Sequence, residues 1–463
     1  MQLGTLLPLA FGAVVGITAL WLSPWFALGG MLAAVGMWWL LRRPNTCLLL
    51  FAFVATLLPF STVNVGIRIT VCELLLVLCW LTMLPTLLRQ PQYLHLTPVH
   101  TALLLFVAWS IVPLVVGEWT VAAEGKSLVN WMRYVLTLSP LVLIPMLITT
   151  RQQAVHLLYA IAAGTTAMLL LSLAIFAIHG GNAQPMMDLL EKLRYAHNDA
   201  VENIFTGTGK RLPSPWVHPN MLGGFLAFMV PVFFLLAQAE VHKRQQHVLF
   251  AVAALAVIGL LLSGSRGALL SLFVMALWLA WRQVRATSRL IVVGLMLGLM
   301  LATSYAPLRE RLETMFSSSN ASTEVRGDEY RNFPRAVERY PLGIGFKSDP
   351  PPDRDLMGIS NLWLNYMYKL GLPGALLFVW ISGRWWKTVR PGPRHLPSDP
   401  LQMGVVAGLL TAQLTGFFDH YFSFSPVLTT LFWMLMGLSI FLARNPVLST
   451  DHLQNRQRLA LRE

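Results

Sequence analysis

Four charged residues of this chain lie at the ends of apolar runs, where a charge is costly. Arg266 lies in Leu262-Ser-Gly-Ser-Arg-Gly-Ala268, between two such runs, and the small residues around it let helices approach closely. Arg133 lies about one turn into another run, and Arg68 and Glu73 flank the start of a third and are expected to pair with each other. An ionisable side chain in such a place predicts a functional role. The alternative for Arg266 and Arg133 is a side chain reaching out to the interface.

A second group of basic residues forms a periodic pattern. Arg331, Arg335 and Arg339 recur every four residues, so on a helix they lie within about 80° of one another. The opposite side of that helix is apolar, and Pro334 is expected near its first turn. A guanidinium binds anionic oxygens bidentately, so this arginine stripe suits phosphate groups. The alternative is a solvated basic face that touches lipid head groups.

Candidate acid or base groups lie in two other segments. Asp419 and His420 stand among aromatic residues, and a carboxylate and an imidazole in a poorly hydrated setting can have shifted pKa values and exchange protons. Arg211 and His218 come shortly before Pro219-Asn220, which predicts the start of a helix. The alternatives are an interfacial helix cap for Asp419 and His420 and a structural hydrogen bond for His218. We find no motif or acidic pair with a clear metal-binding geometry.

The composition indicates that a membrane protein holds these residues. Of 463 residues, 56% are apolar and 12% are charged, and the mean hydropathy is +0.60, whereas a soluble domain has about 25% charged residues. This excludes a cytosolic enzyme, a disordered chain and a secreted disulfide scaffold. The long apolar runs do not alternate, which favours helices over a barrel.

Apolar runs long enough to cross a membrane follow one another along the whole chain. We expect an all-α polytopic membrane protein that forms one integral membrane domain over residues 1–463, with about 12–14 transmembrane helices. The candidate spans are 3–22, 24–41, 45–60, 71–88, 100–116, 128–148, 154–178, 221–238, 248–263, 267–281, 290–305, 359–381, 401–418 and 426–443.

The charge distribution predicts the orientation. With the N-terminus inside, half of the 34 Lys and Arg but few of the 21 Asp and Glu fall in the cytoplasmic connections, so the whole net charge of +13 belongs to that side. It therefore indicates topology, with both termini cytoplasmic, and no binding of nucleic acid. Two external segments, about 179–220 and 306–358, are too long to be turns. We expect them to contain short amphipathic helices.

Five short motifs follow in order around these two loops: Arg211 with His218-Pro-Asn220; Ser263-Gly-Ser-Arg-Gly-Ala268; Arg331 followed by Tyr340-Pro-Leu-Gly-Ile-Gly-Phe346; Asn361-Leu-Trp-Leu with Leu370-Gly-Leu-Pro-Gly374; and Gly416-Phe-Phe-Asp-His-Tyr421. As a set, from about Arg211 to about Leu438, they resemble the bacterial O-antigen ligase and O-antigen polymerase superfamily.

The resemblance implies an inner-membrane glycosyltransferase of lipopolysaccharide or other polysaccharide biosynthesis. Its donor is a glycan on undecaprenyl diphosphate at the periplasmic face, with no cofactor and no metal. A ligase passes the glycan to the lipid A core, and a polymerase passes it to another lipid-linked repeat unit. By similarity, Arg211 and Arg266 bind the diphosphate, assisted by the arginine stripe. Arg133 is a further candidate.

The chain departs from the family pattern at one position. Members of the family carry a histidine directly before the Asn that opens the helix after the long loop, and this chain has Ser360 there. In ligases of the family, this histidine is the favoured general base for the acceptor hydroxyl. In this chain His420, Asp419 or His218 serves as that base, or no strong base is needed. The departure favours a polymerase or a divergent polysaccharide ligase.

Two other function classes remain open. A transporter or flippase for an anionic or lipid-linked solute would have charges near the bilayer midplane and broken helices there. Here the ionisable residues gather at the external ends of the spans. A non-catalytic partner of a polysaccharide export complex is a third class.

Overall fold

The computed structural model describes residues 35–64, 68–90, 96–121, 125–195, 211–240, 242–284, 321–347, 359–392 and 399–445, with isolated positions from 287 to 300. The predicted spans at 3–22 and 290–305, most of 24–41 and parts of the two long loops predicted to be external lie outside these residues.

Within the described residues, seven helical segments are long and apolar enough to cross a membrane, and up to eight if a bent pair counts as one span. They are α4 (Val71–Arg89), α5 (Pro98–Thr120), α6 with α7 (Ser127–Leu138 and Pro140–Leu147), α8 (Arg151–Ile178), α11 (Pro219–Ala239), α12 (Lys243–Ser263) and α20 (Pro426–Arg444). The bent pair joins Val35–Leu41 to α3 (Pro44–Leu57) at 114°. The predicted all-α polytopic membrane fold is confirmed.

Other elements complete the described part of the chain: α9 (Gln184–Lys192), α13 (Arg266–Trp281), α16 (Ala321–Arg339), α17 (Leu362–Val389), α18 (Pro400–Thr415) and α19 (Tyr421–Phe424). A two-stranded antiparallel hairpin, β1 (Thr62–Asn64) and β2 (Arg68–Thr70), joins α3 to α4 and pairs Val63 with Ile69. The helices α9 and α16 lie within the two long segments predicted to be external, where the sequence predicts amphipathic helices.

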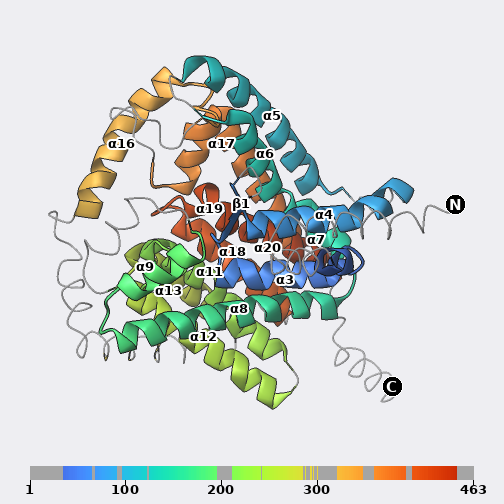
Figure 1. Ribbon diagram of the computed structural model, residues 1–463, viewed down its shortest axis with the longest axis vertical. Coiled ribbons are helices and arrows are strands. Elements are labelled where there is room, and N and C mark those ends of the chain that lie inside the picture. The colour runs from blue at the N-terminus through green and yellow to red at the C-terminus, as the bar shows by residue number, and fades with distance from the viewer. Residues whose placement is uncertain are drawn as a thin grey trace, which may run out of the picture.

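The centre of the bundle is formed by α11, α18 and α20 (Figure 1). Helices α11 and α20 are buried along nearly their whole length, since they are enclosed by the other helices on every side. Close packing of α18 on α11 requires Gly408, because a Cβ there would lie 2.7 Å from the Phe228 carbonyl oxygen. This rigid centre holds the segments that precede α11 and α20.

Helix α16 lies at the left edge of the molecule in Figure 1, outside the bundle. Its C-terminal end is anchored by the turn that follows, where the Ile344 and Gly345 amides donate to the carbonyls of Tyr368 and Lys369. These carbonyls are free to accept because α17 is broken at Gly371, which has φ 68°. The two glycine motifs of the sequence therefore fasten α16 to α17.

The predicted place of Pro334 is wrong. The helix begins at Ala321, so Pro334 lies inside it rather than in its first turn. A proline there leaves the carbonyl of Tyr330 without its helical donor. The break is tolerated because Pro334 is exposed, so water can donate to that carbonyl instead.

Replacing Gly343 by alanine is expected to loosen this anchor. Gly343 has φ 93°, and a Cβ there would lie 2.3 Å from the Lys369 carbonyl oxygen. The backbone strain alone costs about 1–3 kcal/mol, so thermal unfolding of the purified protein in detergent should begin at lower temperature. Gly327→Ala is the matched control: no atom lies within 4 Å of its added Cβ, so a helical Gly→Ala change should stabilise α16. Equal effects of the two substitutions would contradict the anchor.

Candidate active site

Three connecting segments meet at the end of the bundle where α11, α13 and α20 begin. Arg211, in the first, donates from Nε to the Ser263 carbonyl at 2.7 Å and from Nη2 to Asn220 Oδ1 at 2.5 Å. Next to it, the Leu212 amide donates to the Leu262 carbonyl at 3.1 Å. These bonds fix the Arg211 guanidinium between the end of α12 and the start of α11.

Arg266 lies at the same junction of segments. It is the first residue of α13 and follows Ser263, the partner of Arg211, by three residues. Close approach is possible because Gly223 and Gly267 lack side chains: a Cβ on Gly223 would lie 2.4 Å from the Ser265 Cβ, and one on Gly267 would lie 2.6 Å from the Phe418 Cβ. The start of α13 thus touches both α11 and the segment that carries Asp419.

His218 follows a strained turn of the backbone at Val217. Val217 has φ 61°, which is unfavourable for a β-branched residue, and the His218 amide donates to the Trp216 carbonyl at 2.7 Å across it. Strain of this kind costs about 1–3 kcal/mol and is typical of functional sites. It directs the ring toward Tyr421, whose hydroxyl lies 3.0 Å from Nδ1.

The hydrogen bonds of His218 define its tautomer. The Asn220 amide, which can only donate, lies 3.1 Å from Nδ1, so Nδ1 accepts and the proton of the neutral ring is on Nε2. Burial lowers the pKa of His218 to about 4; the negative charge of Asp419 opposes this shift, and the positive charge of Arg211 adds to it. At neutral pH His218 is therefore an uncharged donor through Nε2, with its Nδ1 lone pair already engaged.

The lowered pKa of His218 predicts acid sensitivity. Its folded value of about 4 lies below the ordinary 6.5, so the unfolded chain takes up the proton first. This group therefore causes no loss of stability above about pH 6.5 and a growing loss as the pH falls toward 4. His218→Gln should flatten the fall of the melting temperature between pH 6.5 and 4.5, whereas an unchanged slope would contradict the buried, neutral state.

Asp419 is held by groups from two elements. Its Oδ1 accepts from the His420 amide at 2.9 Å, and its Oδ2 lies 3.4 Å from Nη2 of Arg326 on α16. The carboxylate is 10% exposed. Burial, with Asp419 adding to the effect, raises the pKa of Tyr421 well above its usual value, so Tyr421 stays protonated. His420 Nδ1 is buried, lies 3.5 Å from Asp419 Oδ1, and has no hydrogen-bond partner among the described residues.

Arg326 is a site residue that the sequence reasoning missed. The signal was present: on a helix, Arg326 lies on the same side as the apolar residues Phe333 and Tyr340, which pack onto the protein. The predicted stripe of Arg331, Arg335 and Arg339 is on the other side and exposed. The structure places none of these three against the Arg211 cluster: Arg331 pairs with Asp328 at 3.0 Å, and the Arg339 guanidinium lies 5.6 Å from the Tyr340 ring centre.

Arg133 lies in a separate polar cluster on α6. Its Nε is 3.4 Å from Glu73 Oε1, and its Nη2 donates to the Arg68 carbonyl. The expected pairing of Glu73 with Arg68 is therefore wrong, because Arg133 reaches Glu73 from α6 while Arg68 donates to Thr62 Oγ1 and to the Arg194 carbonyl. Glu73 also completes the capping box of α4.

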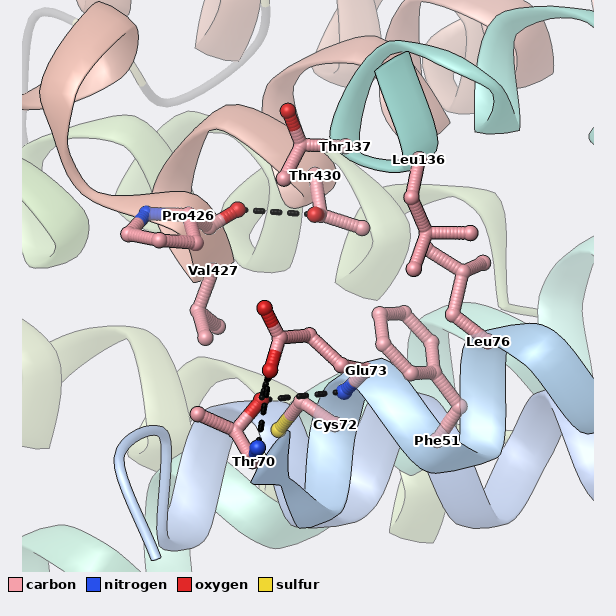
Figure 2. Close-up of a pocket in the computed structure, with 10 residues that line it drawn as sticks. All are labelled: Phe51, Thr70, Cys72, Glu73, Leu76, Leu136, Thr137, Pro426, Val427 and Thr430. Atoms are coloured by element: carbon pink, nitrogen blue, oxygen red, sulfur yellow. Dashed lines mark hydrogen bonds between the residues drawn. The ribbon is translucent and has the colours of Figure 1, made fainter. Parts of the chain in front are cut away.

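Figure 2 shows the Glu73 carboxylate in a small cavity between α4, α6 and the start of α20. It is lined by Phe51, Thr70, Cys72, Glu73, Leu76, Leu136, Thr137, Pro426, Val427 and Thr430. The cavity adjoins α20 rather than the segments that hold Arg211. Arg133 thus joins α6 to the start of α4 through Glu73.

Ser360 is bound by a carboxylate from α16. Glu329 Oε2 accepts from the Ser360 amide at 2.9 Å, and Oε1 accepts from its hydroxyl at 3.0 Å. The next residue, Asn361, caps α17 and donates from Nδ2 to the hydroxyl of Tyr330 at 3.0 Å. Glu329 and Tyr330 are, like Arg326, functional candidates that the sequence reasoning did not single out.

The cluster offers charged and acid–base groups for an anionic substrate. Within the described parts of the chain, no group of three or more His, Cys, Asp or Glu side chains could hold a metal ion. The cluster provides the guanidinium groups of Arg211 and Arg326 and the carboxylate of Asp419. Arg266 lies at the start of α13 at the same junction, and Glu329 lies three residues after Arg326 on α16. Such a set can bind a diphosphate and accept a proton from a hydroxyl.

A comparison with protein-family models matches residues 251–379 to the O-antigen ligase family. No curated protein matches the chain. The matched region contains Arg266, the whole of α16, Ser360 and the break in α17, whereas Arg211, His218 and Asp419 lie outside it. It supports glycan transfer in polysaccharide biosynthesis, as the motifs predict. Residues 251–379 are thus similar to the O-antigen ligase family, which supports the resemblance of the chain to the O-antigen ligase and polymerase superfamily.

Proposed function

We propose that this protein transfers a glycan from undecaprenyl diphosphate to an acceptor hydroxyl at the periplasmic face of the bacterial inner membrane. The reaction is a direct displacement at the anomeric carbon with inversion. The acceptor is another lipid-linked repeat unit in a polymerase or the lipid A core in a ligase. Both termini are cytoplasmic in this orientation, which leaves the Arg211 cluster on the periplasmic side.

The observation that carries the proposal is the placement of Arg211 and Arg266 at one end of the bundle. Negative charge builds up on the diphosphate as the glycosidic bond breaks, and fixed positive charge beside it lowers the barrier. Arg211 is fixed by its bonds to Ser263 and Asn220, so little reorganisation is needed. Both side chains are half-buried, which strengthens their attraction for an anion.

The remaining groups suit the acceptor. His218 offers a neutral Nε2–H donor, and Asp419 and Glu329 offer carboxylate oxygens at the edge of the same cluster. Tyr421 links His218 to the segment that carries Asp419. These groups can hold a sugar hydroxyl on the side of the anomeric carbon opposite to the leaving diphosphate, as inversion requires.

The test uses the full chain in nanodiscs with undecaprenyl-diphosphate-linked glycan extracted from the host strain. One arm contains this donor alone, and a second arm adds lipid A core from the same strain. We expect release of undecaprenyl diphosphate together with a glycan that is longer in the first arm or attached to the core in the second. Donor that crosses the bilayer without being cleaved would instead identify a flippase and overturn the proposal.

The glycan pattern of a deletion strain separates the two acceptors. Loss of chain length, with one repeat still attached to the lipid A core, identifies a polymerase. Loss of all attached glycan, with long chains left on the carrier lipid, identifies a ligase. An unaltered pattern contradicts both forms of the proposal.

A further inference from the structure

Three residues of α16 make polar contacts at one edge of the site. Arg326 reaches Asp419, Glu329 binds Ser360, and Tyr330 accepts from Asn361. Residues 329 and 330 follow Arg326 by three and four positions, so all three lie on one face of the helix. The C-terminal end of α16 is held to α17 by the turn that contains Gly343 and Gly345. Glu329 is thereby brought to Ser360 by a helix that is held by these contacts and by its C-terminal turn.

Glu329 has unused hydrogen-bonding capacity and, unlike Asp419, forms no ion pair with any arginine that the structure describes. Its two oxygens each accept one bond from Ser360, and an ionised carboxylate can accept about four. Asn361, the neighbour of Ser360, is locked by capping α17 and by its 3.4 Å bond to the Phe417 carbonyl. Ser360 thus holds the carboxylate still and leaves a lone pair on each oxygen for a third donor.

The other candidate bases are less suited to accept a proton. The one lone pair of His218 Nδ1 already accepts from the Asn220 amide, and the Tyr421 hydroxyl lies 3.0 Å from the same nitrogen. Asp419 is the ion-pair partner of Arg326 and accepts from the His420 amide. His420 Nδ1 is buried against Asp419, where a substrate hydroxyl cannot reach it.

We propose that Glu329 is the general base of the transfer and that Ser360 is its positioning residue. This inference rests on the proposed function. The acceptor oxygen forms a bond to the anomeric carbon while the carbon–oxygen bond to the diphosphate breaks. The acceptor proton passes to Glu329, and undecaprenyl diphosphate leaves with the electron pair. Glu329 then returns the proton to water.

The experiment compares Glu329→Ala with wild type in the nanodisc assay, using the extracted lipid-linked glycan and, as a second nucleophile, sodium azide. Azide carries no proton, so its attack needs no base. We expect transfer to the hydroxyl acceptor to fall by about 10²-fold, as typical for loss of a general base. Transfer to azide, detected as the glycosyl azide, should be retained. Glu338→Gln is the matched control, because Glu338 is an exposed carboxylate on the same helix.

The positioning role has its own readout. Ser360→Ala removes the hydroxyl bond but keeps the amide bond to Glu329, so kcat for the hydroxyl acceptor should fall by about tenfold or less, with KM nearly unchanged. Transfer to azide should again be unaffected.

The outcomes separate this inference from the proposed function. If the wild-type protein releases no undecaprenyl diphosphate, the proposed function fails. If wild type is active and Glu329→Ala keeps full transfer to the hydroxyl, Glu329 is not the base. If Glu329→Ala loses both acceptors equally while its melting temperature is unchanged, Glu329 serves donor binding, and the inference is overturned.

Discussion

Replacing Arg266 by alanine should abolish glycan transfer and leave the protein folded in the membrane. Arg266 is half-buried at the first turn of α13, beside the segment that holds Arg211. Loss of a fixed group that stabilises transition-state charge costs about 10³-fold in rate, or about 4 kcal/mol. The measurement is the rate of undecaprenyl diphosphate release from the lipid-linked glycan, corrected for protein level.

Two further variants sharpen this prediction. Arg266→Lys keeps the charge but loses the planar fork, so it should recover little activity if binding is bidentate. Arg335→Ala is the matched control, because Arg335 lies on the exposed side of α16, and its activity should stay within about twofold of wild type. Full activity in Arg266→Ala would remove the main support for a diphosphate site, and a large loss in Arg335→Ala would bring the arginine stripe back into it.

The fold class was readable from the sequence because hydropathy is a property of each segment by itself. Long apolar runs must form helices in lipid, and the structure has helices at every predicted span that it describes. The break in α17 was harder to predict. It depends on a turn that is distant in sequence. The Gly345 amide of that turn donates to the Lys369 carbonyl, and the Gly343 backbone lies so close to the same carbonyl that a Cβ would not fit. Contacts between segments far apart in sequence leave only a weak signal in either one.

The charged residues of the site were likewise only partly predictable from the sequence. The motif at Arg266 was found because a charge between apolar runs is conspicuous. The arginine stripe was also conspicuous, yet it lies on the exposed side of α16. Arg326 and Glu329 were overlooked because they lie closer to the apolar face of an amphipathic helix, where the expected residue is apolar. A polar residue on the packed face of such a helix is therefore a better indicator of a site than a regular series of exposed charges.

The contact of Arg326 with Asp419 predicts strong coupling between the two residues. Arg326 joins α16 to the segment before α20, and Asp419 is 10% exposed, so removal of either partner leaves the other poorly satisfied. Arg326→Ala and Asp419→Asn should each lower the rate of glycan transfer by about 10²-fold. The double variant should lose about as much as either single variant, since residues that act as one unit are not additive.

The control is a second ion pair on the same helix. Arg331 and Asp328 lie 3.0 Å apart, but their side chains are 80% and 49% exposed, and exposed pairs contribute at most about 1 kcal/mol. Arg331→Ala, Asp328→Asn and their combination should all retain transfer within about twofold. If the losses at Arg326 and Asp419 multiply instead, each residue acts on the substrate by itself, and α16 is not held to the site through this pair. A coupled loss there, with none at Arg331 and Asp328, would mean that activity depends on where α16 is fastened rather than on how much charge it carries.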